Sequence, residues 1–112
     1  MKLINKTTGV TLAENIGFAD TFGKRLVGLL GKDSLPAGSA LYLSPCLQVH
    51  TFFMRFTMDA VFVDARGKAL KVLREMPPWR VSPWVTGASG VYEFAAGALA
   101  GKVKEGDELL LS

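Results

Sequence analysis

Cysteine and histidine are nearly absent from this chain of 112 residues, which contains one of each, Cys46 and His50. A single cysteine excludes an intramolecular disulfide, which is typical of proteins that fold in a reducing compartment. No apolar run approaches the roughly 20 residues that a membrane-spanning helix requires. Residues 1–9 also lack the apolar core and the small-residue cleavage site of a signal peptide. We therefore expect a cytoplasmic protein without a membrane span, or a periplasmic or secreted one if a leader has been removed.

A strong charge of one sign is missing as well, since 13 Lys and Arg face 10 Asp and Glu and the formal net charge is +3. The basic residues are spread along the chain, whereas nucleic-acid-binding proteins gather them on one face. We therefore expect no nucleic-acid partner. With 49% apolar and 21% charged residues, the composition fits a single domain over residues 1–112, present as a monomer or weak homodimer.

The common catalytic signatures are absent too. The sequence contains no phosphate-binding loop, dinucleotide-binding fingerprint, nucleophile elbow or metalloprotease helix. We therefore expect a protein that is not an enzyme and that needs no cofactor.

Short stretches rich in apolar residues predict many strands. Residues 1–5 and 10–15 flank a turn containing Gly9, a pattern typical of a β-hairpin. Further strands are predicted at residues 40–43, 49–53, 60–65, 68–74, 91–95 and 108–111.

One helix is predicted between the hairpin and the later strands. Leu26, Leu29 and Leu30 recur at helical spacing after a capping Asp20, so the helix is placed at residues 20–31. The expected fold class is α+β and mostly β, a small, partly closed barrel or sandwich of about 7–8 short strands with this one main helix.

Several motifs occur in a distinctive order. They are Gly28-Leu29-Leu30-Gly31, His50-Thr51-x-x-Met54, Asp59-x-x-Phe62-x-Asp64, Pro78-Trp79-Arg80, Glu93-x-x-x-Gly97 and Gly106-Asp107. In this order and spacing, roughly residues 10–112 resemble the bacterial and archaeal "domain of unknown function 192" family. The resemblance implies a compact, mostly β fold with one helix, and it implies no established catalytic residues.

Polar and aromatic residues concentrate in two segments of an otherwise apolar chain. One runs from His50 to Asp59, and the other is a proline-rich loop that contains Trp79, Arg80 and Trp84. Aromatic and Arg side chains are over-represented in binding hot spots, and rigid prolines lower the entropy cost of binding. We therefore expect a binding or accessory module for a small molecule, a sugar or a protein segment. Its candidate ligand-binding residues are His50, Thr51, Arg55, Asp59, Trp79, Arg80 and Glu93.

Two alternatives involve the cysteine. Cys46, His50 and Met54 follow at four-residue intervals, and their thiolate, imidazole and thioether groups together suit Cu(I), so the chain could be a copper-handling protein. Cys46 and His50 could also act as the nucleophile and base of a small thiol enzyme or hydrolase. In both cases the same side chains could instead fill a core, because Met and free Cys pack well in apolar interiors.

Overall fold

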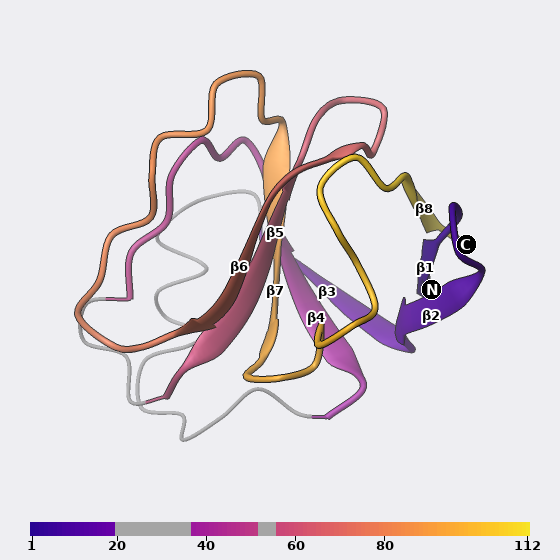
Figure 1. Cartoon of the computed structure of the whole chain (residues 1–112), viewed down its shortest axis with the longest axis horizontal. Helices are drawn as coiled ribbons and strands as arrows, with labels where there is room; N and C mark the ends of the chain where they lie inside the picture. The colour runs from indigo at the N-terminus through magenta and orange to yellow at the C-terminus, as the bar shows by residue number, and fades with distance from the viewer. Residues whose placement is uncertain (20–36, 52–55) are drawn as a thin grey trace.

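A computed structural model describes residues 1–19, 37–51 and 56–112 of the chain. Eight strands in these ranges form one sheet of three strands and one of five (Figure 1). The strands are β1 (Leu3–Asn5), β2 (Val10–Ala13), β3 (Asn15–Ala19), β4 (Ser39–Leu43), β5 (Met58–Val63), β6 (Ala69–Met76), β7 (Gly90–Ala95) and β8 (Leu109–Leu111).

The three-stranded sheet has the order β2-β1-β8 and is antiparallel. The hairpin predicted from the alternation around Gly9 is confirmed, because β1 pairs with β2. The other neighbour of β1 is β8, and the backbones of Lys2 and Ser112 exchange hydrogen bonds of 2.8 and 2.9 Å. Both ends of the chain therefore lie at this sheet (Figure 1).

The five-stranded sheet has the order β3-β4-β7-β5-β6. All neighbours are antiparallel except β3 and β4, which run parallel. Every residue of β5 is buried, which explains the apolar run at residues 60–63, since a strand covered on both faces does not alternate with polar residues.

Each face of the five-stranded sheet has its own apolar cluster. Side chains such as Val61 and Phe94 pack with Leu3 and Leu109 of the three-stranded sheet. On the opposite face Phe62 and Val91 pack with residues of two long loops. These loops and the three-stranded sheet thus lie on opposite sides of the five-stranded sheet (Figure 1).

The predicted fold class is wrong. The described residues contain only strands, and neither sheet's strand order closes on itself, so the α+β class and the partly closed barrel are replaced by two open sheets. The helix predicted at residues 20–31 lies outside the described residues. In the described part of the chain, no helix is long and apolar enough to span a membrane.

Two predicted strand segments differ from the structure by more than a shift of their ends. The segment 10–15 ends as a strand at Ala13, and a separate strand, β3, begins at Asn15. The segment predicted as a strand at 49–53 makes, in its described part, one isolated bridge between His50 and Val81. Its partner segment contains Pro77, Pro78 and Pro83, whose missing N–H groups prevent a regular ladder.

Candidate functional site

Two loops distant in sequence run side by side on one face of the five-stranded sheet (Figure 1). We call residues 44–51 and 77–85 the loop pair. Four backbone hydrogen bonds join them: Val85 N to Leu47 O at 2.8 Å, Ser82 N to Val49 O at 2.8 Å, Thr51 N to Arg80 O at 2.9 Å and Trp79 N to Thr51 O at 3.0 Å. Of the predicted segment from His50 to Asp59, the structure thus pairs His50 and Thr51 with the tryptophan loop.

Thr51 is the main polar tie within the loop pair. Its side chain is fully buried, and its hydroxyl donates to Pro77 O at 2.6 Å and accepts from Arg80 N at 2.9 Å. Between these two partners Trp79 adopts a left-handed backbone conformation with φ of 64°. For a residue other than glycine this conformation costs about 1–2 kcal/mol, so the bonds of Thr51 hold a strained turn in place.

Ser82 makes a second tie. It is 4% exposed, and its hydroxyl accepts from Val49 N at 3.0 Å and donates to Pro83 O at 2.9 Å. The Ser82 carbonyl in turn accepts from Gln48 Nε2 at 2.9 Å. With Thr51, this network satisfies several backbone groups that the prolines leave without ladder partners.

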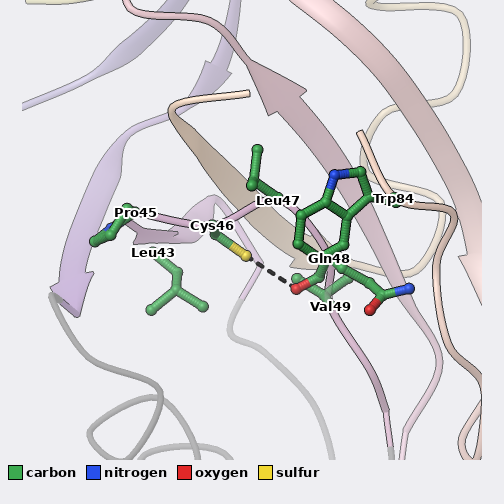
Figure 2. A pocket seen from close by; sticks show the side chains of 7 residues that line it. All are labelled: Leu43, Pro45, Cys46, Leu47, Gln48, Val49 and Trp84. Atoms are coloured by element: carbon green, nitrogen blue, oxygen red, sulfur yellow. Dashed lines mark hydrogen bonds between the residues drawn. The ribbon is translucent and has the colours of Figure 1, made fainter. Parts of the chain in front are cut away.

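A pocket of about 390 Å³ lies beside these hydrogen-bonded residues. Figure 2 shows its lining, which is Leu43, Pro45, Cys46, Leu47, Gln48, Val49 and Trp84. None of these seven residues is Asp, Glu, Lys, Arg or His, so the described walls carry no permanent charge. Such walls suit a neutral, largely apolar group.

The Cys46 thiol belongs to this pocket wall. The side chain is 9% exposed, and Sγ donates to Gln48 O at 3.2 Å (Figure 2). Reactive cysteines are partly exposed and lie in electropositive surroundings, whereas the described lining of this pocket carries no charge. The thiol-enzyme hypothesis for Cys46 and His50 stays a prediction.

Three large apolar side chains of the second loop face solvent. Trp79, Val81 and Trp84 are 56%, 51% and 63% exposed. Exposed apolar side chains gathered on one segment are a common mark of interaction surfaces. Trp84 belongs both to this surface and to the pocket wall, so the two features are continuous.

The structure brings four of the predicted ligand-binding residues together in the loop pair, and two others lie in strands of the five-stranded sheet. His50 is half-buried opposite Val81, Thr51 is buried, and Trp79 and Arg80 are exposed, all within the loop pair. Asp59 and Glu93 lie in β5 and β7 of the five-stranded sheet. Arg55 and Met54 lie outside the described residues.

Asp59 is fully buried and acts on the backbone. Its Oδ1 accepts from Glu75 N at 2.7 Å, and its Oδ2 accepts from Leu99 N at 3.0 Å. Glu75 has a positive φ of 54°, and the pairing of β5 with β6 shifts register between Met58 and Ala60. Both oxygens of Asp59 thus fix a bulge in β6 and the chain that follows β7.

Glu93 is a carboxylate inside the sheet. It is fully buried in β7, opposite Leu41 on one side and Ala60 on the other. Because side chains alternate along a strand, Glu93 shares the face of Val91, which packs with the loop pair's apolar residues. Glu93 therefore does not reach solvent, and a buried carboxylate of this kind requires compensating interactions.

The copper hypothesis for Cys46, His50 and Met54 stays a prediction. Within the ranges that the structure describes, no three side chains among His, Cys, Asp and Glu are grouped so as to hold a metal ion. Met54 falls outside those ranges. Elemental analysis and Cu(I) titration of the purified chain and of Cys46→Ala test this hypothesis.

The sequence predicts only part of the pocket lining. Trp84 is an aromatic residue of the proline-rich loop, whereas Leu43, Leu47 and Gln48 belong to no predicted site. The run from Pro45 to Val49 has no charged residue, and that feature is the signal that could have indicated an apolar pocket wall.

Comparison with known proteins identifies the family. Residues 3–111 match the DUF192 family, whose description is "Uncharacterized ACR, COG1430". The chain belongs to the DUF192 family. The resemblance inferred from the ordered motifs is thereby confirmed.

Curated relatives of this DUF192 chain are archaeal. A UPF0127 protein of Thermococcus sibiricus is 32% identical over 105 residues, which cover 87% of this chain and 65% of the relative. A UPF0127 protein of Pyrococcus furiosus is 30% identical over 83 residues, which cover 70% of this chain and 69% of the relative. The chain thus matches about 65% of the length of the first relative.

Two solved structures have the same fold as this DUF192 chain. A protein of unknown function from Novosphingobium aromaticivorans has a TM-score of 0.81 at 16% identity and covers 99% of this chain and 84% of its own. A protein of Sinorhizobium meliloti, named as a putative transcription regulator, has a TM-score of 0.78 at 18% identity and covers 97% of this chain and 89% of its own. At these identities the likeness establishes the fold, and the family has no specific function assigned.

Proposed function

We propose that this DUF192 chain is a non-catalytic binding module whose ligand is a protein segment that inserts an apolar side chain into the pocket of the loop pair. The observation that carries the proposal is the pocket of about 390 Å³, whose described lining carries no charge and includes Trp84, which is 63% exposed. Ligand pockets in proteins typically measure about 300–1,000 Å³ and are lined mainly by apolar and aromatic side chains.

The chemistry of the lining favours an apolar side chain over a sugar. Sugars require several hydrogen-bonding partners besides a stacking surface. Gln48 is the one side chain of the described lining with an amide, hydroxyl or charged group, and one of its two N–H groups donates to Ser82 O. The exposed side chains of Trp79 and Val81 extend the apolar surface beyond the pocket, as an extended partner segment would need.

The loop pair also supports binding through its rigidity. The hydroxyls of Thr51 and Ser82 are buried and hydrogen-bonded, and prolines restrict the second loop. A loop that is already ordered loses little conformational freedom when a partner binds, so more of the contact energy remains for affinity.

Nuclear magnetic resonance titration of the full chain tests the proposal. N-acetyl-phenylalaninamide serves as the apolar side-chain probe and methyl β-glucoside as the sugar probe. We expect saturable shifts of the Trp84 indole N–H and of the amides of Leu47 to Val49 with the first probe only. Trp84→Ala should weaken binding about tenfold, as expected for a central aromatic contact.

Phe18→Ala is the matched control, because Phe18 is an aromatic residue of β3 that is 57% exposed and lies outside the pocket lining. It should leave the affinity unchanged. Saturable binding of the glucoside alone would replace the protein segment by a sugar. Chemical-shift changes that stay linear in the concentration of both probes would refute the site. An equal loss of affinity in Trp84→Ala and Phe18→Ala would also refute it.

A further inference from the structure

We propose that a second pocket, formed where β6 meets the turn before β8, binds the phosphate group of a small molecule. This pocket has a volume of about 400 Å³. Its polar lining consists of Thr8, Arg74, Gly101, Lys102, Lys104 and Asp107. None of these residues belongs to the loop pair, so the proposal is independent of the function proposed above.

Buried polar contacts fix the turn that carries the two lysines. Asn5 is fully buried, and its Nδ2 donates to Lys102 O at 2.9 Å and to Asp107 Oδ2 at 2.8 Å. The same Asp107 oxygen accepts from Lys104 N at 3.0 Å. The turn is therefore tied to β1, which lies about a hundred residues earlier in the chain.

Arg74 of the five-stranded sheet also holds this turn in place. It lies in β6, and its Nη2 donates to Val103 O at 2.8 Å. A guanidinium has five N–H donors in a fixed fork, so this bond orients the group and leaves other donors for an anion. Arg74 and the two lysines of the turn thus line one hollow, with the Arg74 side chain and the backbone of the turn fixed by hydrogen bonds.

The pocket carries an excess of positive charge. Three cations and one carboxylate line it, and three minus one leaves a net charge of +2. The carboxylate, Asp107, is 2% exposed and accepts bonds from Asn5 and Lys104. Among carboxylates of the described residues, none forms an ion pair with Arg74, Lys102 or Lys104. The three positive charges repel one another, and a bound anion offsets this repulsion by attracting all of them.

Phosphate matches these donors better than a carboxylate does. A phosphate monoester carries about two negative charges at neutral pH and three strong acceptor oxygens. Arg74 can contact two of these oxygens, the lysines supply point charges, and the Thr8 hydroxyl is a further donor. Gly101 has a φ of +69°, and no atom lies within 4 Å of where its Cβ would be, so the backbone can be approached closely at that side.

Titration of the full ¹⁵N-labelled chain with inorganic phosphate at constant ionic strength tests the proposal. We expect saturable shifts of the amides of Thr8 and of residues 101–104. Lys102→Ala and Lys104→Ala involve exposed side chains and preserve the fold, and each should weaken phosphate binding about fivefold. Arg74→Gln should weaken it at least as much.

Arg66→Ala is the matched control, because it removes one exposed positive charge from the turn between β5 and β6, outside the pocket lining. It should change the affinity less than twofold. Shifts that are linear in phosphate, or an equal loss in the Arg66 variant, would show general charge attraction and overturn the site. Citrate binding as tightly as phosphate would overturn the assignment to phosphate.

Discussion

Replacing Thr51 by valine removes one hydroxyl from the loop pair while preserving the shape of the side chain. Thr51 is fully buried, and its hydroxyl makes bonds of 2.6 Å to Pro77 O and 2.9 Å from Arg80 N. Its backbone bonds to Trp79 and Arg80 do not involve the side chain. The substitution therefore isolates the contribution of the hydroxyl.

The expected cost follows from the two backbone groups that lose their partner. Leaving a buried donor or acceptor unsatisfied costs about 1–3 kcal/mol, and the exposed surroundings of Arg80 allow partial hydration, so we expect about 2–3 kcal/mol for Thr51→Val in total. The strained φ of Trp79 loses its support at the same time. For a domain of this size the loss lowers Tm by about 10 °C.

Urea unfolding and amide hydrogen exchange measure this effect. The Arg80 amide should exchange about 30–150-fold faster in Thr51→Val, the rate ratio that corresponds to about 2–3 kcal/mol. Thr11→Val is the control, because Thr11 is half-buried in β2 and valine is favoured in strands, so it should be neutral. If both variants lie within about 0.5 kcal/mol of the parent chain and the Arg80 amide stays protected, the hydroxyl does not hold the loop pair.

Three further predictions concern the scaffold. Asp59→Asn replaces one of two buried acceptor oxygens by an amide nitrogen, so the free energy of unfolding in urea should fall by about 2–4 kcal/mol. An unchanged free energy of unfolding would show that Asp59 does not fix the bulge in β6. In Gly67→Ala, the new Cβ at a φ of +87° would collide with Leu109 O, so the free energy of unfolding should fall by about 3 kcal/mol or more. Gly97→Ala, at a φ of +82°, meets no neighbour, so its free energy of unfolding should fall by about 1 kcal/mol. Burial raises the pKa of Tyr92 from 10.0 to about 12. The folded chain therefore keeps a proton that the unfolded chain loses, and stability should fall as the pH rises from 10.0 to about 12, which ultraviolet titration and alkaline unfolding can follow.

The sequence predicted local pairings better than long-range ones. The hairpin of β1 and β2 follows from alternation around Gly9, and β5 to β8 follow from short apolar runs. The parallel pairing of β3 with β4 joins segments separated by residues 20–38, and no local pattern encodes such a partner. The predicted barrel was wrong for this reason, because strand order decides between a barrel and two sheets.

The candidate site was predictable in part. Polar and aromatic residues in irregular segments predict one candidate site from the His50 and Trp79 segments, and the structure pairs His50 and Thr51 with the Trp79 loop. The sequence-based prediction includes Asp59 and Glu93 among the ligand-binding residues, because a charged residue in an apolar run is typical of a binding site and of a buried structural contact alike. For Asp59 the two backbone amides it binds come from Glu75 and Leu99, and their approach depends on the whole sheet.

The position of Trp79 links the interior of the loop pair to its surface. Trp79 is 56% exposed and held at a φ of 64°, a conformation that a free loop would seldom adopt. The carbonyl of the buried Thr51 accepts from the amide of Trp79. Its hydroxyl donates to Pro77 O and accepts from Arg80 N, on either side of Trp79. Because buried groups of the chain itself maintain the strained conformation, the exposed indole is already positioned in the unliganded chain. A partner that contacts this indole would therefore lose little affinity to ordering the turn.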